Sequence, residues 1–168
     1  MAAGPALAAL VAVILISVLA RSPYLVLTNV QDGSTLLLHK AYEGEMFSVS
    51  YIHSVNISPV EEFYRIRQNG IVLVALEFET FGAGMPTDIQ PEQSLIRLPT
   101  GGMRIESYER HIDDLRYLIG YDVNQTLHIG AQQIPLDALA IAGQSVRFAF
   151  YRLNFWQKLY LTFNTRTI

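Results

Sequence analysis

After residue 23 the chain consists of short runs in which apolar and polar residues alternate, and turn residues separate the runs. Residues 24–29 and 35–39 flank Gln31-Asp32-Gly33-Ser34, a sequence typical of a β-hairpin turn. Strands of this length at this spacing predict an all-β domain, built as an antiparallel β-sandwich or barrel. The other predicted strands are residues 46–55, 60–67, 71–81, 95–98, 103–108, 115–119, 126–129, 133–136 and 145–153.

The alternation also predicts which side chains of the central hairpin face the core. Apart from His53 and Glu62, the odd positions of residues 46–55 and the even positions of residues 60–67 are apolar or aromatic. A hairpin that closes across residues 55–58 places both sets on one face and leaves Glu61 outside. His53 and Glu62 then lie on the core face, directly opposite one another or diagonal, and we expect them to form a pair.

A histidine and a glutamate on an apolar face need partners, because burial of an unpaired charge is costly. The pair could be a satisfied polar contact that fixes the register of the two strands. Alternatively it could face a ligand in a pocket, since titratable groups with perturbed environments are typical of functional sites. We favour the first interpretation.

The next turn determines which residues of the following strand face the core. A two-residue Asn69-Gly70 turn would direct Glu77 and Glu79 inward. A three-residue Gln68-Asn69-Gly70 loop, with Gly70 in the left-handed region, instead directs an apolar set inward. The sequence therefore predicts the bulged turn, with the inward set Val72, Val74, Leu76 and Phe78.

Two segments have ambiguous patterns. Residues 111–118 could form one or two helical turns, because Asp113 and Asp114 suit a strand poorly. In residues 155–163 the aromatic positions fit helical spacing and strand alternation almost equally well. We expect a core or edge strand there; as a helix, the segment would suit a membrane interface or a neighbouring subunit through Trp156, Lys158 and Tyr160.

The N-terminal segment differs from the rest. Residues 6–20 carry no charge, and Ser17 is their one polar residue. As a helix they rise about 22 Å, less than the roughly 30 Å of a bilayer's hydrocarbon core. We predict an N-terminal apolar helix in residues 1–23, retained as a membrane anchor, followed by a single β-rich domain in residues 24–168. A signal peptide cleaved after Ala20 and a buried core helix are the alternatives.

Composition narrows the possible chemistry. The net charge of −3 gives no reason to expect a nucleic-acid partner. The absence of cysteine excludes disulfides, thiolate nucleophiles and cysteine-ligated metal centres. The four histidines have no metal-ligand spacing, and no GxSxG sequence is present. We therefore predict no catalytic residues, no metal and no cofactor, and a protein that is not an enzyme.

Two stretches of sequence carry a family resemblance. Residues 51–66 read YIHSVNISPVEEFYRI, and residues 81–86 read FGAGMP. The chain resembles the bacterial domain-of-unknown-function family eighteen-fifty, in which a His-Ser-Val segment, a Pro-Val-Glu-Glu segment and a Phe-Gly-Ala-Gly-Leu-Pro-like loop follow in this order. Met85 replaces the leucine of that loop. The corresponding residues are His53, Ser54, Val55, Pro59, Val60, Glu61, Glu62, Phe81, Gly82, Ala83, Gly84 and Pro86.

The resemblance implies a small extracytoplasmic or membrane-anchored β-rich module. Genes for such proteins tend to lie beside those of TAXI-type TRAP transporters, which import organic anions with a periplasmic binding protein and a cation gradient. We therefore expect a non-enzymatic accessory protein of such a transporter, single-pass in the inner membrane with its domain in the periplasm. Its expected partners are the permease subunits and the binding protein.

A second hypothesis is an independent β-sandwich that binds a small ligand. The glycine loop at residues 82–86 lacks the lysine and the following helix of a nucleotide-binding loop, but it could form the rim of a pocket. The candidate ligand-binding residues are Tyr51, His53, Glu62, Gly82 and Gly84.

Overall fold

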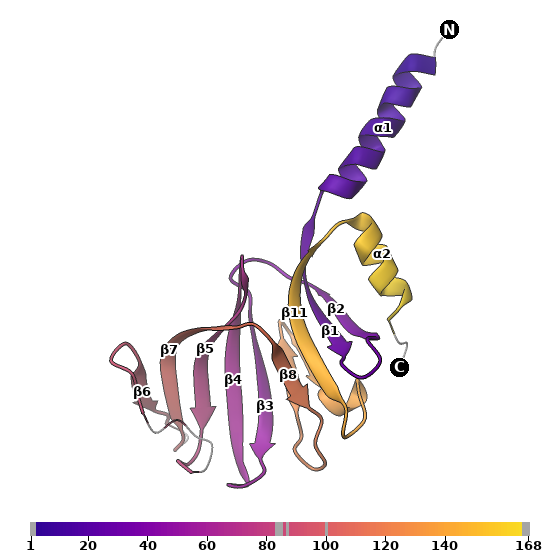
Figure 1. Cartoon of the computed structure of the whole chain (residues 1–168). Coiled ribbons are helices and arrows are strands. Elements are labelled where there is room, and N and C mark those ends of the chain that lie inside the picture. Colours follow the sequence, from indigo (N-terminus) through magenta and orange to yellow (C-terminus); the bar gives the residue numbers. More distant parts are fainter. Residues whose placement is uncertain (1–2, 83–85, 87, 100, 166–168) are drawn as a thin grey trace.

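The computed structural model describes residues 3–82, 86, 88–99 and 101–165. In these residues two antiparallel sheets pack face to face, and a helix lies near each end of the chain (Figure 1). The prediction of an antiparallel β-sandwich is confirmed. The smaller sheet has the order β2–β1–β11–β8, with β1 Ser22–Asn29, β2 Thr35–Lys40, β8 Leu115–Leu118 and β11 Ser145–Leu153.

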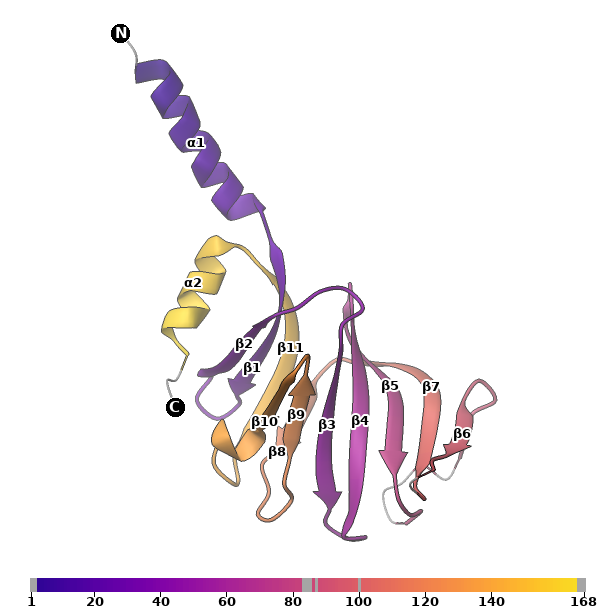
Figure 2. The ribbon, with the colours of Figure 1, turned by 180° about the vertical axis from the view of Figure 1, so that it is seen from behind.

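The larger sheet contains most of residues 51–66, the first of the two family-like stretches, on β3 and β4. Its order is β10–β9–β3–β4–β5–β7–β6. The sheet is a succession of hairpins, with β9 of the β9–β10 hairpin pairing to β3 (Figure 2). The strands are β3 Met46–His53, β4 Ser58–Arg67, β5 Gly70–Phe78, β6 Ser94–Arg97, β7 Met103–Ile112, β9 Thr126–Ile129 and β10 Gln132–Pro135.

The main core lies where the inner faces of the two sheets meet. The Phe47 ring stacks on Tyr64 of the neighbouring strand, with 5.1 Å between ring centroids, and on Phe148 of the other sheet at 6.0 Å. A second, smaller cluster fills the far end of β4, β5 and β7, where Ile89 of the β5–β6 connection packs on Phe78 and its neighbours. Ile89 therefore adds a residue from outside the strands to this second cluster.

The predicted inward faces of the central hairpin are correct within the paired strands, but Val55, also predicted to face inward, lies beyond β3 and is exposed. In the β3–β4 pairing Phe47 lies opposite Tyr64 and Tyr51 lies opposite Val60, all on the core side. The predicted His53–Glu62 pair is wrong. His53 lies opposite Ser58, whereas Glu62 lies opposite Val49. The two side chains are four positions apart along the hairpin, or about 13 Å.

The predicted β4–β5 register is correct for only half of the strand. Arg67 pairs with Gly70, so the turn has two residues, and Gly70 has a φ of 135°. Ile71 and Leu73 therefore occupy the inward positions predicted for Val72 and Val74. A bulge opposite residues 63–64 then reverses the alternation, so that Leu76 and Phe78 face inward as predicted.

A wide bulge also interrupts β7. Leu73 pairs with Arg110 and Ala75 pairs with Glu106, so three residues of β7 face a single residue of β5. Two of the three, Ser107 and Glu109, have positive φ values of 63° and 41°. Non-glycine residues adopt this conformation at a cost, which the surrounding sheet must offset.

Of the two ambiguous segments, one assignment is confirmed and one is wrong. Residues 111–118 contain the end of β7 and the whole of β8, not a helix. The strand predicted for residues 155–163 is the helix α2, Phe155–Phe163. The physical reason is a capping box: Asn154 accepts a hydrogen bond from the backbone N–H of Gln157, whose side chain accepts one from the backbone of Asn154.

The N-terminal helix α1, Ala3–Leu19, stands away from the sandwich (Figures 1 and 2). Its 17 residues rise about 25 Å, against roughly 30 Å for a hydrocarbon core. Among the described residues, no helix is both long enough and apolar enough to span a membrane.

Candidate functional site

A glutamate held by tyrosines lies between the two sheets. Glu62 comes from β4 of the larger sheet, and its Oε2 accepts hydrogen bonds from the hydroxyls of Tyr64, at 2.9 Å, and Tyr117. The two hydroxyl oxygens are 2.8 Å apart. Because Tyr117 belongs to β8 of the smaller sheet, this hydrogen-bonded cluster connects the two layers.

Two further tyrosines flank this cluster. The ring of Tyr51 lies 6.3 Å from that of Tyr117. The Tyr108 hydroxyl is buried and, within the described part of the chain, has no hydrogen-bond partner. Tyr108 occupies the middle of the β7 bulge, so the strained backbone there places its ring against both apolar clusters.

The environment of the four hydroxyls favours their neutral form. Burial raises the pKa of Tyr51, Tyr64, Tyr117 and Tyr108, because the charged tyrosinate would lose its solvation. The nearby negative charge of Glu62 raises the pKa of all four further. The cluster is thus a set of proton donors around one acceptor, an arrangement that suits structural hydrogen bonding.

His53 is placed at the end of the β3–β4 hairpin. Its Nδ1 accepts hydrogen bonds from the backbone N–H groups of Val55 and Asn56, at 3.3 and 3.4 Å. The histidine therefore stabilises the turn that carries the family-like motif, rather than pairing with Glu62. Such a side-chain-to-backbone bond within a turn is a structural role.

Gly82, at the start of the glycine loop, meets this turn. A Cβ atom at Gly82 would lie only 2.4 Å from Oδ1 of Asn56, so the loop approaches the turn more closely than another residue would allow. The buried amide nitrogen of Asn56 has no hydrogen-bond partner among the described residues. The structure thus brings together His53 and Gly82 through Asn56, which the sequence did not single out. Gly84 lies outside the described residues.

The predicted ligand-binding residues therefore separate into two places. Tyr51 and Glu62 belong to the tyrosine cluster between the sheets, and His53 and Gly82 belong to the hairpin end. Tyr108 and Tyr117 were missed as members of the first group. The inward position of Tyr117 could be expected from its place between Leu115 and Ile119. Its contact with Glu62 could not, because the two residues are 55 positions apart in the sequence and belong to different sheets.

A row of polar residues crosses the outer face of the larger sheet. Ser50, Glu61, Glu77 and Arg104 are successive partners across β3, β4, β5 and β7. Arg104 bonds Glu77 at 2.5 Å and lies 4.4 Å above the ring of Phe63. Glu61 faces outward as predicted and accepts a hydrogen bond from Ser48 at 2.5 Å.

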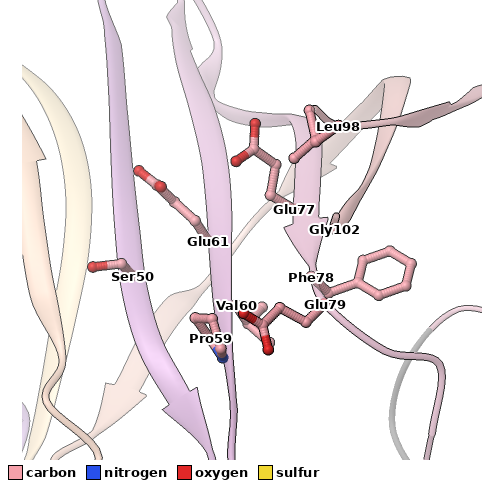
Figure 3. Close-up of a pocket in the computed structure, with 9 residues that line it drawn as sticks. All are labelled: Ser50, Pro59, Val60, Glu61, Glu77, Phe78, Glu79, Leu98 and Gly102. Carbon is pink, nitrogen blue, oxygen red and sulfur yellow. The ribbon is translucent and has the colours of Figure 1, made fainter. Parts of the chain in front are cut away.

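The end of this row borders a hollow of about 180 Å³. Figure 3 shows Glu61 and Glu77 on neighbouring strands at its wall. Since Glu61 and Glu62 are consecutive in a strand, they point to opposite faces, and the hollow is separate from the tyrosine cluster. The lining residues are Ser50, Pro59, Val60, Glu61, Glu77, Phe78, Glu79, Leu98 and Gly102.

One pair on the outer face resembles part of a hydrolytic site. Ser50 Oγ and His128 Nε2 are 2.9 Å apart on neighbouring strands. Ser50 lies inside β3, which pairs with β4 on one side and β9 on the other, so the surrounding backbone N–H groups serve the sheet ladders. Acyl transfer needs free donors for a developing oxyanion. The pair therefore lacks the surroundings of a serine hydrolase.

In the described part of the chain, no three histidine, aspartate or glutamate residues are grouped so that they could hold a metal ion.

The end of the sandwich that carries the helices is apolar. α2 packs through Leu161 on Tyr24, Val26 and Leu153, on the outer side of the smaller sheet. Near its N-terminus, Trp156 Nε1 donates a hydrogen bond to Ser17 Oγ of α1 at 3.1 Å. The Asn154 and Gln157 pair was the sequence signal for this helix, because a capping box marks a helix start.

Comparison with known proteins gives one finding. Residues 47–136 match the model of a family described as "Domain of unknown function (DUF1850)". No curated protein and no solved structure matches the chain. The matched segment includes both stretches that carry the resemblance, and it covers more than half of the 168 residues. The chain therefore belongs to the DUF1850 family.

Proposed function

We propose that this protein is a non-enzymatic accessory module of a TAXI-type TRAP organic-anion transporter. In this proposal the N-terminal segment holds the module at the inner membrane, and the β-sandwich lies on the periplasmic side. The module assists assembly of the permease or contact with its binding protein. The transporter class and the compartment rest on what the family resemblance implies.

The observation that carries the proposal is the exposed apolar surface of α1. Large aliphatic side chains on all sides of the helix are exposed, for example Leu7 at 63%, Val13 at 63% and Leu19 at 72%. A soluble protein rarely leaves so much contiguous apolar surface in water, and such surfaces are typical of membrane or protein contacts. The side chains of the sandwich, by contrast, form their own core.

The two ends of the sandwich differ in a way that suits an adaptor. α1 leaves the sandwich at one end, and the β3–β4 turn lies at the opposite end (Figures 1 and 2). This distal end combines the His53-supported turn, the close approach of Gly82 and the hollow beside Glu61. A protein held by α1 would present this end to a soluble partner such as the binding protein.

The test is purification of the tagged full-length chain from membranes of its native host. Permease subunits should co-purify with it, and deletion of its gene should reduce substrate uptake. A matched pair of variants separates membrane placement from general surface change: Ile14→Glu in α1 should leave the membrane fraction, whereas Ile141→Glu, in an exposed loop, should remain there. Normal uptake and permease assembly in the deletion strain would overturn the proposal.

A second candidate is the binding of a small ligand at the hairpin end. The buried amide nitrogen of Asn56, which has no hydrogen-bond partner among the described residues, favours it, because such groups are usually satisfied. A thermal-shift screen of organic anions tests this candidate. Stabilisation that is lost in Asn56→Ala and kept in Glu43→Gln, at an exposed position outside the hairpin end, would support it; an unchanged melting temperature throughout would reject it.

A further inference from the structure

The outward face of α2 carries a stripe of exposed aromatic side chains. Trp156, Tyr160 and Phe163 follow one another at spacings of four and three residues, which places them on one side of a helix. Their side chains are 53%, 69% and 80% exposed. The opposite side of the helix is already engaged, because Leu161 packs on the smaller sheet and Lys158 Nζ lies 5.9 Å above the Tyr24 ring.

This stripe continues onto α1. Trp156 bonds Ser17, and between the two helices lies an apolar hollow of about 530 Å³. Its lining combines Val13, Ile14, Ile16, Ser17 and Ala20 of the N-terminal segment with Phe155 and Trp156 of α2. The two helices therefore present one apolar surface at one end of the molecule.

The form of this surface favours lipid over a protein groove. A groove covers one side of a helix, but α1 exposes large apolar side chains around its whole circumference, including Leu10, Val11, Ile14, Leu15 and Val18. Tryptophan and tyrosine combine an apolar ring with a polar group, which suits the boundary between acyl chains and headgroups.

The distribution of charge points to an anionic lipid surface. All 15 acidic residues lie between Asp32 and Asp137, although the chain as a whole has a net charge of −3. The terminal segments that form and flank the two helices contain only basic charges, among them Arg21, Arg152 and Lys158. Basic side chains beside an apolar helix are attracted to anionic headgroups.

We propose that α2 lies in the interface of an anionic bilayer, with Trp156, Tyr160 and Phe163 directed into the lipid, and forms a second membrane contact beside α1. This inference rests on the membrane placement in the proposed function and adds an orientation to it. Two contacts fix the sandwich relative to the bilayer, so that the β3–β4 end is held away from the membrane instead of moving freely about α1.

The chain contains its own probe, since Trp156 is its single tryptophan. The full-length protein is mixed with vesicles of phosphatidylglycerol and phosphatidylcholine, and with vesicles of phosphatidylcholine alone. With the anionic vesicles we expect a blue shift of the tryptophan emission, protection from acrylamide, and quenching by lipids brominated near the headgroup. The lipid concentration needed should rise with added salt, because the headgroup attraction is screened.

Two variants test the aromatic stripe without removal of the probe. Tyr160→Ser combined with Phe163→Ser should raise the lipid concentration at half-maximal blue shift by about tenfold to a hundredfold, since two largely exposed rings lose their lipid contact. Tyr121→Ser is the matched control, because Tyr121 is 81% exposed but lies outside the helical end. Circular dichroism of each variant confirms that α2 and the sandwich are folded.

The outcomes separate this inference from the proposed function. If the protein sediments with vesicles while Trp156 stays accessible to acrylamide, α1 alone binds lipid and the inference on α2 is overturned. If the protein does not sediment with either vesicle, both the inference and the membrane placement fail. A blue shift that depends on protein concentration and needs no lipid shows that a second copy of the chain covers α2, which also overturns the inference.

Discussion

Substitution of Glu62 tests whether the tyrosine cluster holds the two sheets together. In Glu62→Gln the side chain keeps its shape but loses the charge that strengthens the hydrogen bonds from Tyr64 and Tyr117. Hydrogen bonds to a charged group contribute about 1.5–3 kcal/mol and neutral ones about 0.5–1.5 kcal/mol. The difference is about 1–1.5 kcal/mol per bond, or about 2–3 kcal/mol for two bonds. Because Glu62 is only half-buried and solvent screens its charge, we expect a loss of about 1–2 kcal/mol in the free energy of unfolding.

Urea unfolding, followed by circular dichroism, measures this loss as a shift of the midpoint at constant slope. The single variant alone is not decisive, because removal of a buried charge also removes its desolvation penalty. A double-mutant cycle with Tyr117→Phe isolates the contact, and we expect a coupling energy of about 1–2 kcal/mol. Glu79→Gln, at an exposed position, should change stability by less than about 0.5 kcal/mol. A coupling energy near zero between Glu62 and Tyr117 would refute the assigned role.

Three other predictions concern stability. Because burial raises the pKa of Tyr64 and Tyr117 above the ordinary value of about 10, the folded state keeps protons that the unfolded chain releases. The contribution of these groups to stability should therefore be constant below pH 10 and fall above it. These two groups should contribute a fall of about 3 kcal/mol per pH unit, to which Tyr51 and Tyr108 add, measured by urea unfolding at several alkaline pH values; a slope unchanged in Tyr64→Phe would contradict it. Gly82→Ala should lower the melting temperature because its Cβ would meet the Asn56 side chain, and Asn56→Ala in the same chain should restore part of the loss; no such restoration would show that the contact is not the cause. Asn154→Ala should cost about 1 kcal/mol and reduce the helical signal, whereas equal helicity in the variant would show that the capping box is not needed for α2.

Local pattern was sufficient to predict most strands. The runs around β1, β2, β9 and β11 have boundaries within two residues of those predicted, because alternation and hairpin turns are local properties of the sequence. The parity argument also placed Glu61 outside and Glu62 inside. Both the extent of a strand and the side to which its residues point follow from the two-residue alternation along that strand, whichever strand it pairs with.

The errors arise where a distant contact or a bulge decides the structure. The bulge in β7 has non-glycine residues at positive φ, Ser107 and Glu109, and no sequence signal predicts it. The two-residue turn sets the β4–β5 register in the first half of β5, and the bulge shifts it by one residue in the second half. The partner of Glu62 comes from the second sheet, so hairpin parity could not identify Tyr117. The strand predicted over α2 was a different kind of error, since Asn154 and Gln157 are themselves a local sequence signal for a helix start.

The pairing of β1 with β11 has a consequence for how the protein folds. Ser22 lies opposite Leu153, so the first and last strands are neighbours in the smaller sheet. The family-matched residues 47–136 contain only β8 of that sheet. During synthesis, the β1–β2 hairpin forms early, but β1 can pair with β11 only after the chain has been made as far as residue 153. Such non-local pairing slows folding and leaves apolar strands open to aggregation until the chain has passed residue 153.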